Sequence, residues 1–509
     1  MRPTDINKLS VEEKIGQLVM SRLDFNDPGS LPLARKLVAE CHVGGFIIFG
    51  GTRENVKQAA RELEAASRIP LFFACDAERG VGQIVSGTTL FPFTMSLGAI
   101  GDEELVYRQA CLIAGEMREC GLNLVLAPVA DINTNPNNPI INIRSYGDDP
   151  GLVSRLSLSF IKGLRDNGIL SCAKHFPGHG GTGVDSHIDM PVSDQSADDL
   201  LSRDLIPFQS AVDGGVTCIM PAHIAYPEIS GEKIPATISE ALIKGILRDR
   251  LGFGGLVVTD SFRMEGIGKS GDEADMSGLA LKSGCDIILD PKEPETLLAR
   301  LREMAQLGVL DDYKLNEALS RIIGIKNKWL TGPASDPVNI LENPNSLKVR
   351  IAEGSACLLK GGRLKSDNAL VYVFDVTNSE RDISAAFMSK MKEAGVTCKR
   401  HDVSLTQDAA SVLSLSDGFD AVICLIFTTV GAWKKESFLP GNYRSVLSKL
   451  ETLPQEKVLV SFGSPYVVSG FGGFDTVLCV FDTMDVCQAA AGDVLSGKIK
   501  AGGVMPLKL

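Results

Sequence analysis

The chain has 509 residues, of which 44% are hydrophobic and 22% are charged. This length predicts two domains, or one large domain with an appendage, and the composition is typical of a soluble globular enzyme. The formal net charge is −12 and no basic stripe stands out, which argues against nucleic acid and membrane surfaces as partners.

The amino terminus, "MRPTDINKLSVEEKIGQLVM", is polar and lacks the apolar stretch and cleavage site of an export signal. Ser10 followed by Glu13 predicts a capping box that opens a helix. No apolar run is long enough to span a bilayer. These features predict a cytoplasmic protein whose twelve cysteines are reduced thiols, mostly in the core.

Short apolar runs recur through the first two thirds of the chain, separated by longer amphipathic segments. Seven runs lie at residues 44–51, 71–76, 122–131, 169–175, 218–223, 256–260 and 285–290, and an eighth lies near "FPFTMSLG". Strands that are buried on both faces and alternate with helices form a parallel sheet. Residues 1–335 are therefore predicted to form a catalytic (β/α)8 barrel.

Most of these runs end in a polar side chain that can take part in chemistry. The residues are Asp76, Asp131, Lys174 with His175, His223 and Asp260. In a (β/α)8 barrel the active site lies at the carboxyl ends of the strands. The pattern supports the barrel and predicts which end of it holds the site.

The composition changes near "TGPASDPVNILENPN", where proline, glycine and asparagine predict a linker at residues 336–348. A second alternation of apolar and amphipathic segments follows, including "ALVYVFDV", "AVICLIF" and "TVLCVFD". Residues 349–509 are predicted to form a smaller doubly wound α/β sandwich domain. This part has no nucleotide-binding glycine motif and a single histidine, His401, which favours a scaffolding role.

Residues 174–191, "KHFPGHGGTGVDSHIDMP", hold three of the six histidines of the chain. His175 and His179 have the spacing of two zinc ligands on a helix. Further side chains could complete such a metal site: Asp185, His187 and His223. The proline and glycines between and after the two histidines argue against a helix, so we expect no metal here.

An anion cradle made of the glycine-rich backbone and Lys174 is a second alternative, although the strip lacks the G-K-[ST] ending of a phosphate-binding loop. Acid/base chemistry uses more of the residues. Asp185 and His187 are two positions apart, so on a bent loop the carboxylate can fix the imidazole tautomer, and the histidine can protonate a leaving group and then deprotonate water. The alternative is a solvated loop histidine near an aspartate by chance.

Asp260 ends the run "LVVTD" and is the candidate nucleophile or electrostatic stabiliser. A carboxylate that projects into the barrel mouth can attack an anomeric carbon and form a covalent glycosyl intermediate. The alternative role for an aspartate at this place is to cap the helix that follows.

These motifs together resemble glycoside hydrolase family 3, and within it the bacterial β-N-acetylglucosaminidases. Lys174 to Pro191 is similar to the branch signature K-H-F-P-G-x-G-x-x-x-x-D-S-H-x-x-x-P. Further stretches that resemble the family are "LSVEEKIGQL", "FACDAERG", "APVADI", "INIRSYGDDP", "IMPAHIAYP" and "VVTDSFRMEGI". The likeness covers residues 9 to about 330, and "RIAEGSACLLKGG" resembles the entry into the second domain of the family.

The resemblance implies a retaining exo-glycosidase that needs no cofactor and takes a small carbohydrate substrate. It implies that Asp260 is the nucleophile, that His187 is the acid/base on a mobile loop, and that Asp185 is its partner. It also implies a set of residues that bind the substrate: Asp76, Arg144, Lys174, His175, His223 and Met264. The preference for N-acetylglucosaminides rests on the resemblance alone, and His179 receives no role.

Two departures from the family pattern lie beside these residues. The D-x-E-G-G-x-V-x-R of the family reads "DAERGVGQI" here, so Arg79 replaces a glycine and Ile84 replaces an arginine expected to contact sugar. The common T-D-D-L reads "TDSF", which places Ser261 beside Asp260. The loss of a neighbouring carboxylate should make Asp260 easier to ionise.

A histidine as the acid/base leaves the acceptor open, because a neutral imidazole repels an anion less than a carboxylate does. Water is favoured, whereas phosphate would make the protein a phosphorylase that releases sugar 1-phosphate. A sugar-binding barrel without catalysis is a third interpretation, favoured by the substituted "DAERGVGQI". An aromatic content of 6% favours short substrates, either muropeptides or chitooligosaccharides, and the sequence leaves open whether the protein is a monomer or a homodimer.

Overall fold

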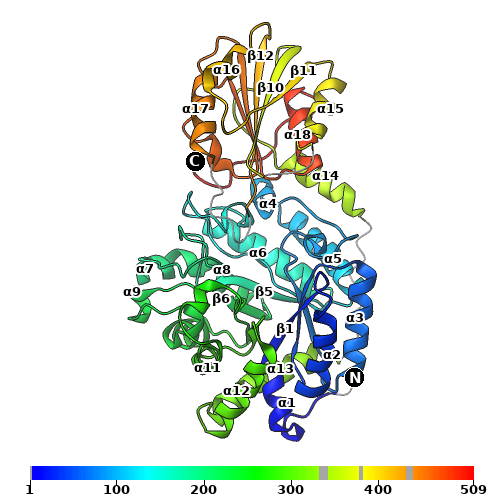
Figure 1. Cartoon of the computed structure of the whole chain (residues 1–509), viewed down its shortest axis with the longest axis vertical. Helices are drawn as coiled ribbons and strands as arrows, with labels where there is room; N and C mark the ends of the chain where they lie inside the picture. The colour runs from blue at the N-terminus through cyan, green and yellow to red at the C-terminus, as the bar shows by residue number, and fades with distance from the viewer. Residues whose placement is uncertain (1–2, 332–341, 378–381, 431–438) are drawn as a thin grey trace. The chain divides into compact units, whose positions relative to one another are not determined.

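The computed structural model of the chain describes residues 3–331, 342–377, 382–430 and 439–509. It divides into two compact units (Figure 1). The first comprises Met1–Leu90, Glu103–Ile132 and Val153–Leu341, and the second comprises Phe91–Asp102, Asn133–Leu152 and Glu342–Leu509. Each unit is assembled from three separate stretches of chain.

The first unit is a closed barrel of eight parallel strands. They are β1 (Val19–Asp24), β2 (Gly45–Phe49), β3 (Phe72–Cys75), β4 (Leu124–Val125), β5 (Leu170–Phe176), β6 (Cys218–Pro221), β7 (Leu256–Val257) and β8 (Ile288–Leu289). Their order is β7-β6-β5-β4-β3-β2-β1-β8, and a parallel bridge between Val258 and Ile287 joins the two ends. The predicted (β/α)8 barrel is confirmed.

One strand of the barrel differs from the prediction. The run near "FPFTMSLG" forms a helix, α4 (Thr94–Ile100), in the second unit, and the remaining strand is β1. Gly98 of α4 lies so close to the backbone of Tyr146 that a Cβ would come 1.7 Å from its carbonyl oxygen, so this helix is fixed by tertiary packing. β1 contains the polar side chains of Arg22 and Asp24, so its sequence is not one of the short apolar runs from which the strands are predicted.

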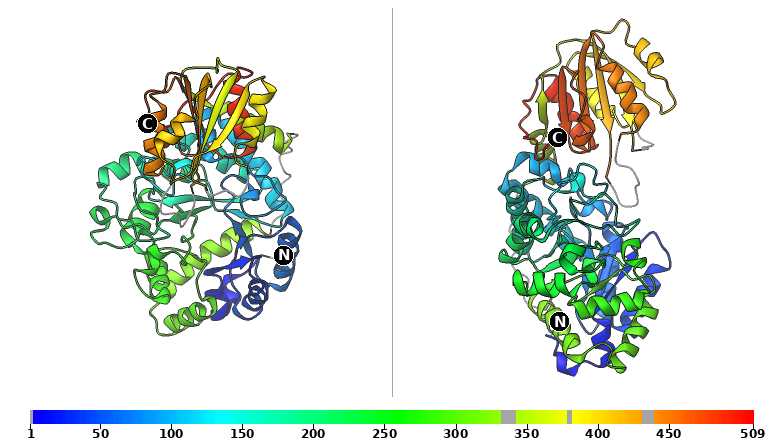
Figure 2. Two further views of the ribbon diagram at one scale, coloured as in Figure 1. Left: turned by 45° about the horizontal axis from the view of Figure 1, so that its top comes forward. Right: turned by 90° about the vertical axis from the view of Figure 1, so that its left-hand side faces the viewer.

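Helices connect the strands and surround them (Figures 1 and 2). The longer ones are α2 (Ser30–Cys41), α3 (Arg53–Ala66), α5 (Glu103–Glu119), α6 (Pro150–Arg165), α8 (Leu205–Asp213), η6 (Ala241–Arg250), α11 (Glu273–Ser283), α12 (Pro294–Gln306) and α13 (Asp312–Trp329). The predicted capping box opens α1 (Val11–Gly16): the Ser10 hydroxyl accepts from the Glu13 amide at 3.1 Å, and the Glu13 carboxylate accepts from the Ser10 amide at 2.9 Å.

The second unit is built on a mixed sheet of six strands in the order β11-β10-β12-β13-β14-β9. The strands are β9 (Cys357–Lys360), β10 (Asn368–Asp375), β11 (Thr397–Asp402), β12 (Ala421–Phe427), β13 (Glu456–Phe462) and β14 (Thr476–Val480), and β9 alone among them pairs antiparallel. Val371 and Val373 of β10 pack into one apolar cluster, whereas Tyr372 and Phe374 pack into the other. Both faces of the sheet are therefore covered, as the α/β sandwich prediction requires.

The two clusters identify the helices on each face. One face carries α14 (Pro344–Gly354), α15 (Ala385–Glu393) and α18 (Asp485–Leu495), and the other carries α16 (Ala409–Ser414) and α17 (Gly441–Leu450). The predicted linker, residues 336–348, falls in part on residues outside the description, and α14 begins inside it at Pro344. The sequence pattern assigns residues 91–102 and 133–152 to the barrel, but they belong to this unit.

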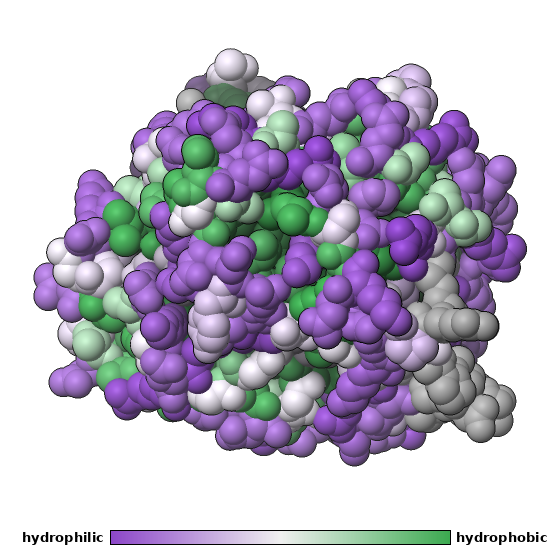
Figure 3. All heavy atoms as spheres, turned by 90° about the horizontal axis from the view of Figure 1, so that it is seen from below, coloured by the Kyte–Doolittle hydropathy of each residue, from purple (hydrophilic) through white to green (hydrophobic). Residues whose placement is uncertain are grey.

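The surface seen from below is mostly hydrophilic, with apolar side chains in separate small groups (Figure 3). Among the residues that the structure describes, no helix is both long and apolar enough to cross a bilayer. All twelve cysteines are free thiols, and ten of them are buried.

A buried lysine lies in the barrel, on α13. The ammonium of Lys326 donates to the side-chain oxygen of Gln17 at 2.6 Å and to the carbonyl oxygen of Gly44 at 2.7 Å. It also lies 4.7 Å from the centroid of the Phe72 ring. Burial lowers the pKa of Lys326 to about 7, although Glu64 acts in the opposite direction.

We predict that Lys326→Met changes how stability depends on pH. The unfolded lysine has a pKa of about 10.4, so between about pH 7 and pH 10 the unfolded chain binds one proton more than the folded chain, and the Lys326 contribution to the free energy of unfolding rises with pH. The wild type should therefore gain roughly 3 kcal/mol relative to the variant over this range. Urea denaturation at several pH values measures it, with exposed Lys328→Met as control; parallel curves would contradict the assignment.

Candidate active site

The carboxyl ends of the barrel strands carry most of the side chains that the sequence singled out. Asp76 follows β3, Lys174 and His175 lie at the end of β5, His223 follows β6, and Asp260 follows β7. The loop after β5, residues 177–191, carries Asp185 and His187, and we call it the acid/base loop. All these groups belong to the first unit.

Lys174 is held by two carboxylates at the mouth of the barrel. Its ammonium lies 2.7 Å from Oδ1 of Asp76 and 2.8 Å from Oε1 of Glu78. The side chains of Lys174 and Glu78 are buried, whereas that of Asp76 is 28% exposed. Asp76 thus keeps an open side toward solvent, and Lys174 fixes its orientation.

Asp131, after β4, anchors the start of the acid/base loop. Its carboxylate accepts from Nδ1 of His175 at 2.7 Å, from the His175 amide at 3.2 Å and from the His179 amide at 2.6 Å. Burial raises the pKa of Asp131, but the interactions with His175 and His179 outweigh it, so the pKa lies below its ordinary value. The carboxylate stays ionised and holds the imidazole of His175 in one orientation.

His179 links separate parts of the acid/base loop by hydrogen bonds. Its Nδ1 lies 2.7 Å from the hydroxyl oxygen of Thr182, its Nε2 lies 3.0 Å from that of Ser186, and the side chain is buried. Gly178 adopts φ +142°, a conformation that favours glycine, and its carbonyl oxygen accepts from the Tyr226 hydroxyl. His179 thereby receives the structural role that the sequence could not assign.

Asp185 and His187 form a hydrogen-bonded pair. Oδ1 of Asp185 lies 2.8 Å from Nδ1 of His187 and accepts from the His187 amide at 2.9 Å. The Asp185 side chain is 2% exposed and that of His187 is 22% exposed. A buried carboxylate at Nδ1 selects the tautomer that carries its proton there, which leaves Nε2 available for proton transfer.

Asp260 lies among three histidines. Burial raises its pKa, but the electrostatic interactions with His175, His223 and His187 outweigh that effect, so the pKa lies below its ordinary value. The Ser261 amide donates to its Oδ1 at 2.8 Å. The carboxylate is therefore ionised, and the influence of His187 shows that the acid/base loop lies near it.

His223 and Met264 are buried, and His223 interacts electrostatically with Asp260. Nδ1 of His223 lies 2.8 Å from the Thr237 hydroxyl, and its Nε2 lies 3.2 Å from the carbonyl oxygen of Ser261. Burial lowers the pKa of His223, which favours the neutral imidazole. The ring thus supports the backbone that follows Asp260, and substrate contact by His223 or Met264 stays a prediction.

The substitution at Ser261 has a structural explanation. Its hydroxyl donates to Oδ2 of Asp290 at 2.8 Å, and Asp290 also binds Arg22 at 2.7 Å and Arg263 at 3.1 Å. A second carboxylate at position 261 would face Asp290 at hydrogen-bonding distance, which like charges disfavour. Serine instead completes the shell of donors around Asp290.

Arg144, predicted to bind sugar, belongs to the second unit, in η3 (Asn142–Arg144). Its guanidinium donates to the carbonyl oxygen of Ile140 at 2.9 Å. Its contact with a substrate stays a prediction.

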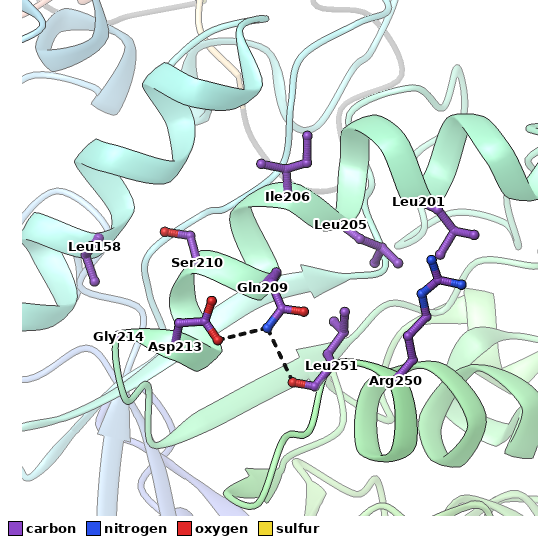
Figure 4. A pocket seen from close by; sticks show the side chains of 10 residues that line it. All are labelled: Leu158, Leu201, Leu205, Ile206, Gln209, Ser210, Asp213, Gly214, Arg250 and Leu251. Carbon is purple, nitrogen blue, oxygen red and sulfur yellow. Dashed lines mark hydrogen bonds between the residues drawn. The ribbon is translucent and has the colours of Figure 1, made fainter.

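No cluster of three or more potential metal ligands occurs within the described ranges, and His175 and His179 lie on a strand end and a loop rather than on a helix. A groove of about 570 Å³ lies elsewhere on the first unit, among α6, α8 and η6 (Figure 4). Leu158, Leu205 and Ile206 line it, and its polar contacts run from Gln209 to Asp213 and to the carbonyl oxygen of Leu251. The groove lies apart from the strand-end side chains that the sequence singled out.

The barrel, the ionised strand-end carboxylate and the His–Asp pair define a class of enzyme that acts on glycosidic bonds. Residues 10–325 match the model of the Glycosyl hydrolase family 3 N terminal domain. The chain belongs to this family, as the sequence motifs predict.

Individual relatives agree with this assignment. β-Hexosaminidase A of Pseudoalteromonas piscicida is 32% identical over 67% of this chain and 62% of its own length, so the match spans less than two thirds of that protein. The β-N-acetylglucosaminidase/β-glucosidase of Cellulomonas fimi is 26% identical over 99% of this chain and 94% of its own. The solved structure of a family 3 β-N-acetylglucosaminidase from Paenibacillus is 28% identical, with a TM-score of 0.85 over 98% of this chain and 99% of that one.

Several side chains at the barrel mouth carry no predicted role. The sequence motifs assign none to Glu78 and Asp290, identify Asp131 only as a strand end, and do not predict β1, which holds Arg22. The available signal is position: Asp131 and Asp290 each end an apolar run that contains a barrel strand, and Glu78 lies two residues after Asp76. Which charges pair with one another could not be read from the chain order.

We predict that Asp131→Asn loosens the loop. The substitution places a neutral amide where three N–H groups now point at a carboxylate. Breaking a buried charged pair lowers the free energy of unfolding by about 3 kcal/mol. The pKa of Asp131 is lower in the folded protein than in the unfolded chain. Its contribution to the free energy of unfolding is therefore present above about pH 4 and is lost as the pH falls through the pKa of the folded state. The difference between wild type and variant should therefore shrink below about pH 4. Denaturation curves with exposed Asp194→Asn as control test this, and equal stability at pH 7 would refute it.

Proposed function

We propose that the chain is a retaining exo-β-N-acetylglucosaminidase that removes terminal N-acetylglucosamine from short amino-sugar glycosides, such as muropeptides or chitooligosaccharides. The observation that carries the proposal is the ionised Asp260 within electrostatic reach of His187, whose Nδ1 is held by Asp185. Family membership and the names of the relatives support it. The preference for the acetamido sugar rests on those relatives.

The first step forms a glycosyl–enzyme ester. Because Oδ1 of Asp260 accepts the Ser261 amide, we assign the attack on the anomeric carbon to Oδ2. The bond from that carbon to the leaving oxygen breaks, and Nε2 of protonated His187 gives its proton to that oxygen. Asp185 stabilises the imidazolium before transfer and stays ionised.

The second step releases the sugar. When Asp260 is esterified its negative charge is gone, so imidazolium loses a favourable neighbour and His187 is ready to act as a base. It takes a proton from water, the water oxygen attacks the anomeric carbon, and Asp260 leaves as a carboxylate. Two inversions give overall retention of configuration.

The remaining predicted residues bind the innermost sugar. We assign hydroxyl contacts to Asp76, because its partly exposed carboxylate is fixed by Lys174, and to His175, which Asp131 orients. Orientation by buried neighbours fits a role in positioning the anomeric carbon for attack. We also assign Lys174, His223 and Met264 to this part of the site, and we place the enzyme in the cytoplasm, in the recycling of cell-wall amino sugars or chitin fragments.

A second candidate is a β-N-acetylglucosaminide phosphorylase that uses the same residues. The observation in its favour is that the acid/base is an imidazole rather than a carboxylate. After the first step the imidazole is neutral, so an anionic acceptor meets little repulsion from it. Phosphate would then attack the anomeric carbon in place of water and release N-acetylglucosamine 1-phosphate.

The first test separates these candidates. The purified protein is incubated with p-nitrophenyl N-acetyl-β-glucosaminide, with and without phosphate, and the sugar product is identified. We expect free N-acetylglucosamine at a rate that phosphate leaves unchanged. Phosphate-dependent formation of the 1-phosphate would favour the phosphorylase, and faster cleavage of the p-nitrophenyl β-glucoside would change the sugar assignment.

The second test concerns Asp260. Asp260→Asn removes the charge that attacks the anomeric carbon, so we expect turnover to fall on the order of 10³-fold or more. Affinity for N-acetylglucosamine, measured by calorimetry, should stay within a few-fold, since the substitution is nearly isosteric. Asp194→Asn serves as the control, and turnover that survives in Asp260→Asn would exclude this nucleophile.

A further inference from the structure

The half of the acid/base loop that carries His187 lies along the segment that follows the nucleophile in sequence. The Gly266 amide, in α10 (Glu265–Gly268), donates to the Ser186 carbonyl oxygen at 3.0 Å. The Glu265 amide points at the His187 carbonyl oxygen at 3.4 Å. Two successive backbone groups of α10 thus contact two successive residues of the loop.

Side chains extend this contact along the loop. The ammonium of Lys269 lies 3.0 Å from Oδ1 of Asp189 and 3.3 Å from the Ile188 carbonyl oxygen. The Ser270 hydroxyl lies 3.8 Å from the sulfur of Met190. The hydrogen bond with Lys269 lowers the pKa of Asp189, so this exposed pair is charged at neutral pH.

Position 266 has no room for a side chain. A Cβ there would lie 2.8 Å from the Ser186 carbonyl oxygen, 3.1 Å from Cβ of His223 and 3.2 Å from the His223 carbonyl oxygen. These neighbours are backbone atoms and the first carbon of a buried side chain, so they cannot move aside easily. The close approach of the loop to α10 therefore requires glycine.

We propose that Gly266 and Lys269 are positioning residues that hold His187 on the segment that follows Asp260. Asp131 fixes the start of the loop and His179 links that start to Ser186, whereas Gly266 and Lys269 hold the stretch from Ser186 to Asp189 on the segment after Asp260. They lie within ten residues of the nucleophile, so one short stretch of chain places both catalytic groups. This inference rests on the proposed function for its kinetic test.

The main experiment compares Gly266→Ala with Gly268→Ala. Gly268 lies in the same helix, where a Cβ would meet only the ends of flexible side chains, 3.4 Å from Lys292 and 3.8 Å from Glu265. The kcat/KM values are measured on two N-acetyl-β-glucosaminides, one methyl and one 2,4-dinitrophenyl. The methyl glycoside needs a proton on its leaving oxygen, and the dinitrophenyl glycoside does not.

Displacement of His187 should remove general acid catalysis, which contributes about 10²–10⁴-fold. We expect Gly266→Ala to lose about 100-fold on the methyl glycoside and less than about 3-fold on the dinitrophenyl glycoside. Gly268→Ala should match the wild type on both. An equal loss on the two substrates, or no loss, would overturn the proposal.

The ion pair gives a second route if Gly266→Ala does not fold. Lys269→Met should lower kcat/KM on the methyl glycoside by about two- to five-fold, the range of an exposed ion pair. High salt should reduce this difference, and the charge-swapped double variant Lys269→Asp/Asp189→Lys should recover part of the loss. A fold-loss in the double variant equal to the product of the fold-losses of Lys269→Asp and Asp189→Lys would overturn the role of the pair.

Hydrogen–deuterium exchange tests the docking without turnover. Amides of residues 186–190 should exchange faster in Gly266→Ala and Lys269→Met than in the wild type and in Gly268→Ala. Unchanged exchange would refute the docking itself. If exchange changes but the wild type cleaves no glycoside, the proposed function fails while the docking stands.

Discussion

The buried carboxylate of Asp131 is the point on which the geometry of the site depends. An ionised group away from water is costly unless hydrogen bonds satisfy it, and here the donors come from His175 and His179. The end of β5 and the start of the acid/base loop therefore cannot move without uncovering that charge. Asp131 thus fixes the start of the acid/base loop.

The other carboxylates at the barrel mouth have two kinds of partner, permanent cations or imidazoles. Lys174 is shared between Asp76 and Glu78, and the guanidinium groups of Arg22 and Arg263 are bound to Asp290. Asp260 interacts electrostatically with imidazoles instead, those of His175, His223 and His187.

The sequence predicted the barrel, the sandwich and the Asp185–His187 pair because each leaves a local pattern. Buried parallel strands are short apolar runs, and two residues two positions apart on a loop can meet through a local turn. Charge pairs such as Asp131 with His175 bring together strands far apart in sequence, and apolar runs do not specify them. The strand β1 and the helix α4 were misassigned because tertiary packing, at Arg22 and at Gly98, decides both.

The division of each unit among three stretches of chain affects how the protein can be made. Met95, Ala99 and Ile143 are buried in the same apolar cluster as the strands of the second sheet, which a ribosome completes last. A nascent chain released after α13 would carry these side chains without their partners, as exposed apolar surface. A shortened gene that ends near residue 335 would therefore encode an aggregation-prone product rather than an autonomous barrel.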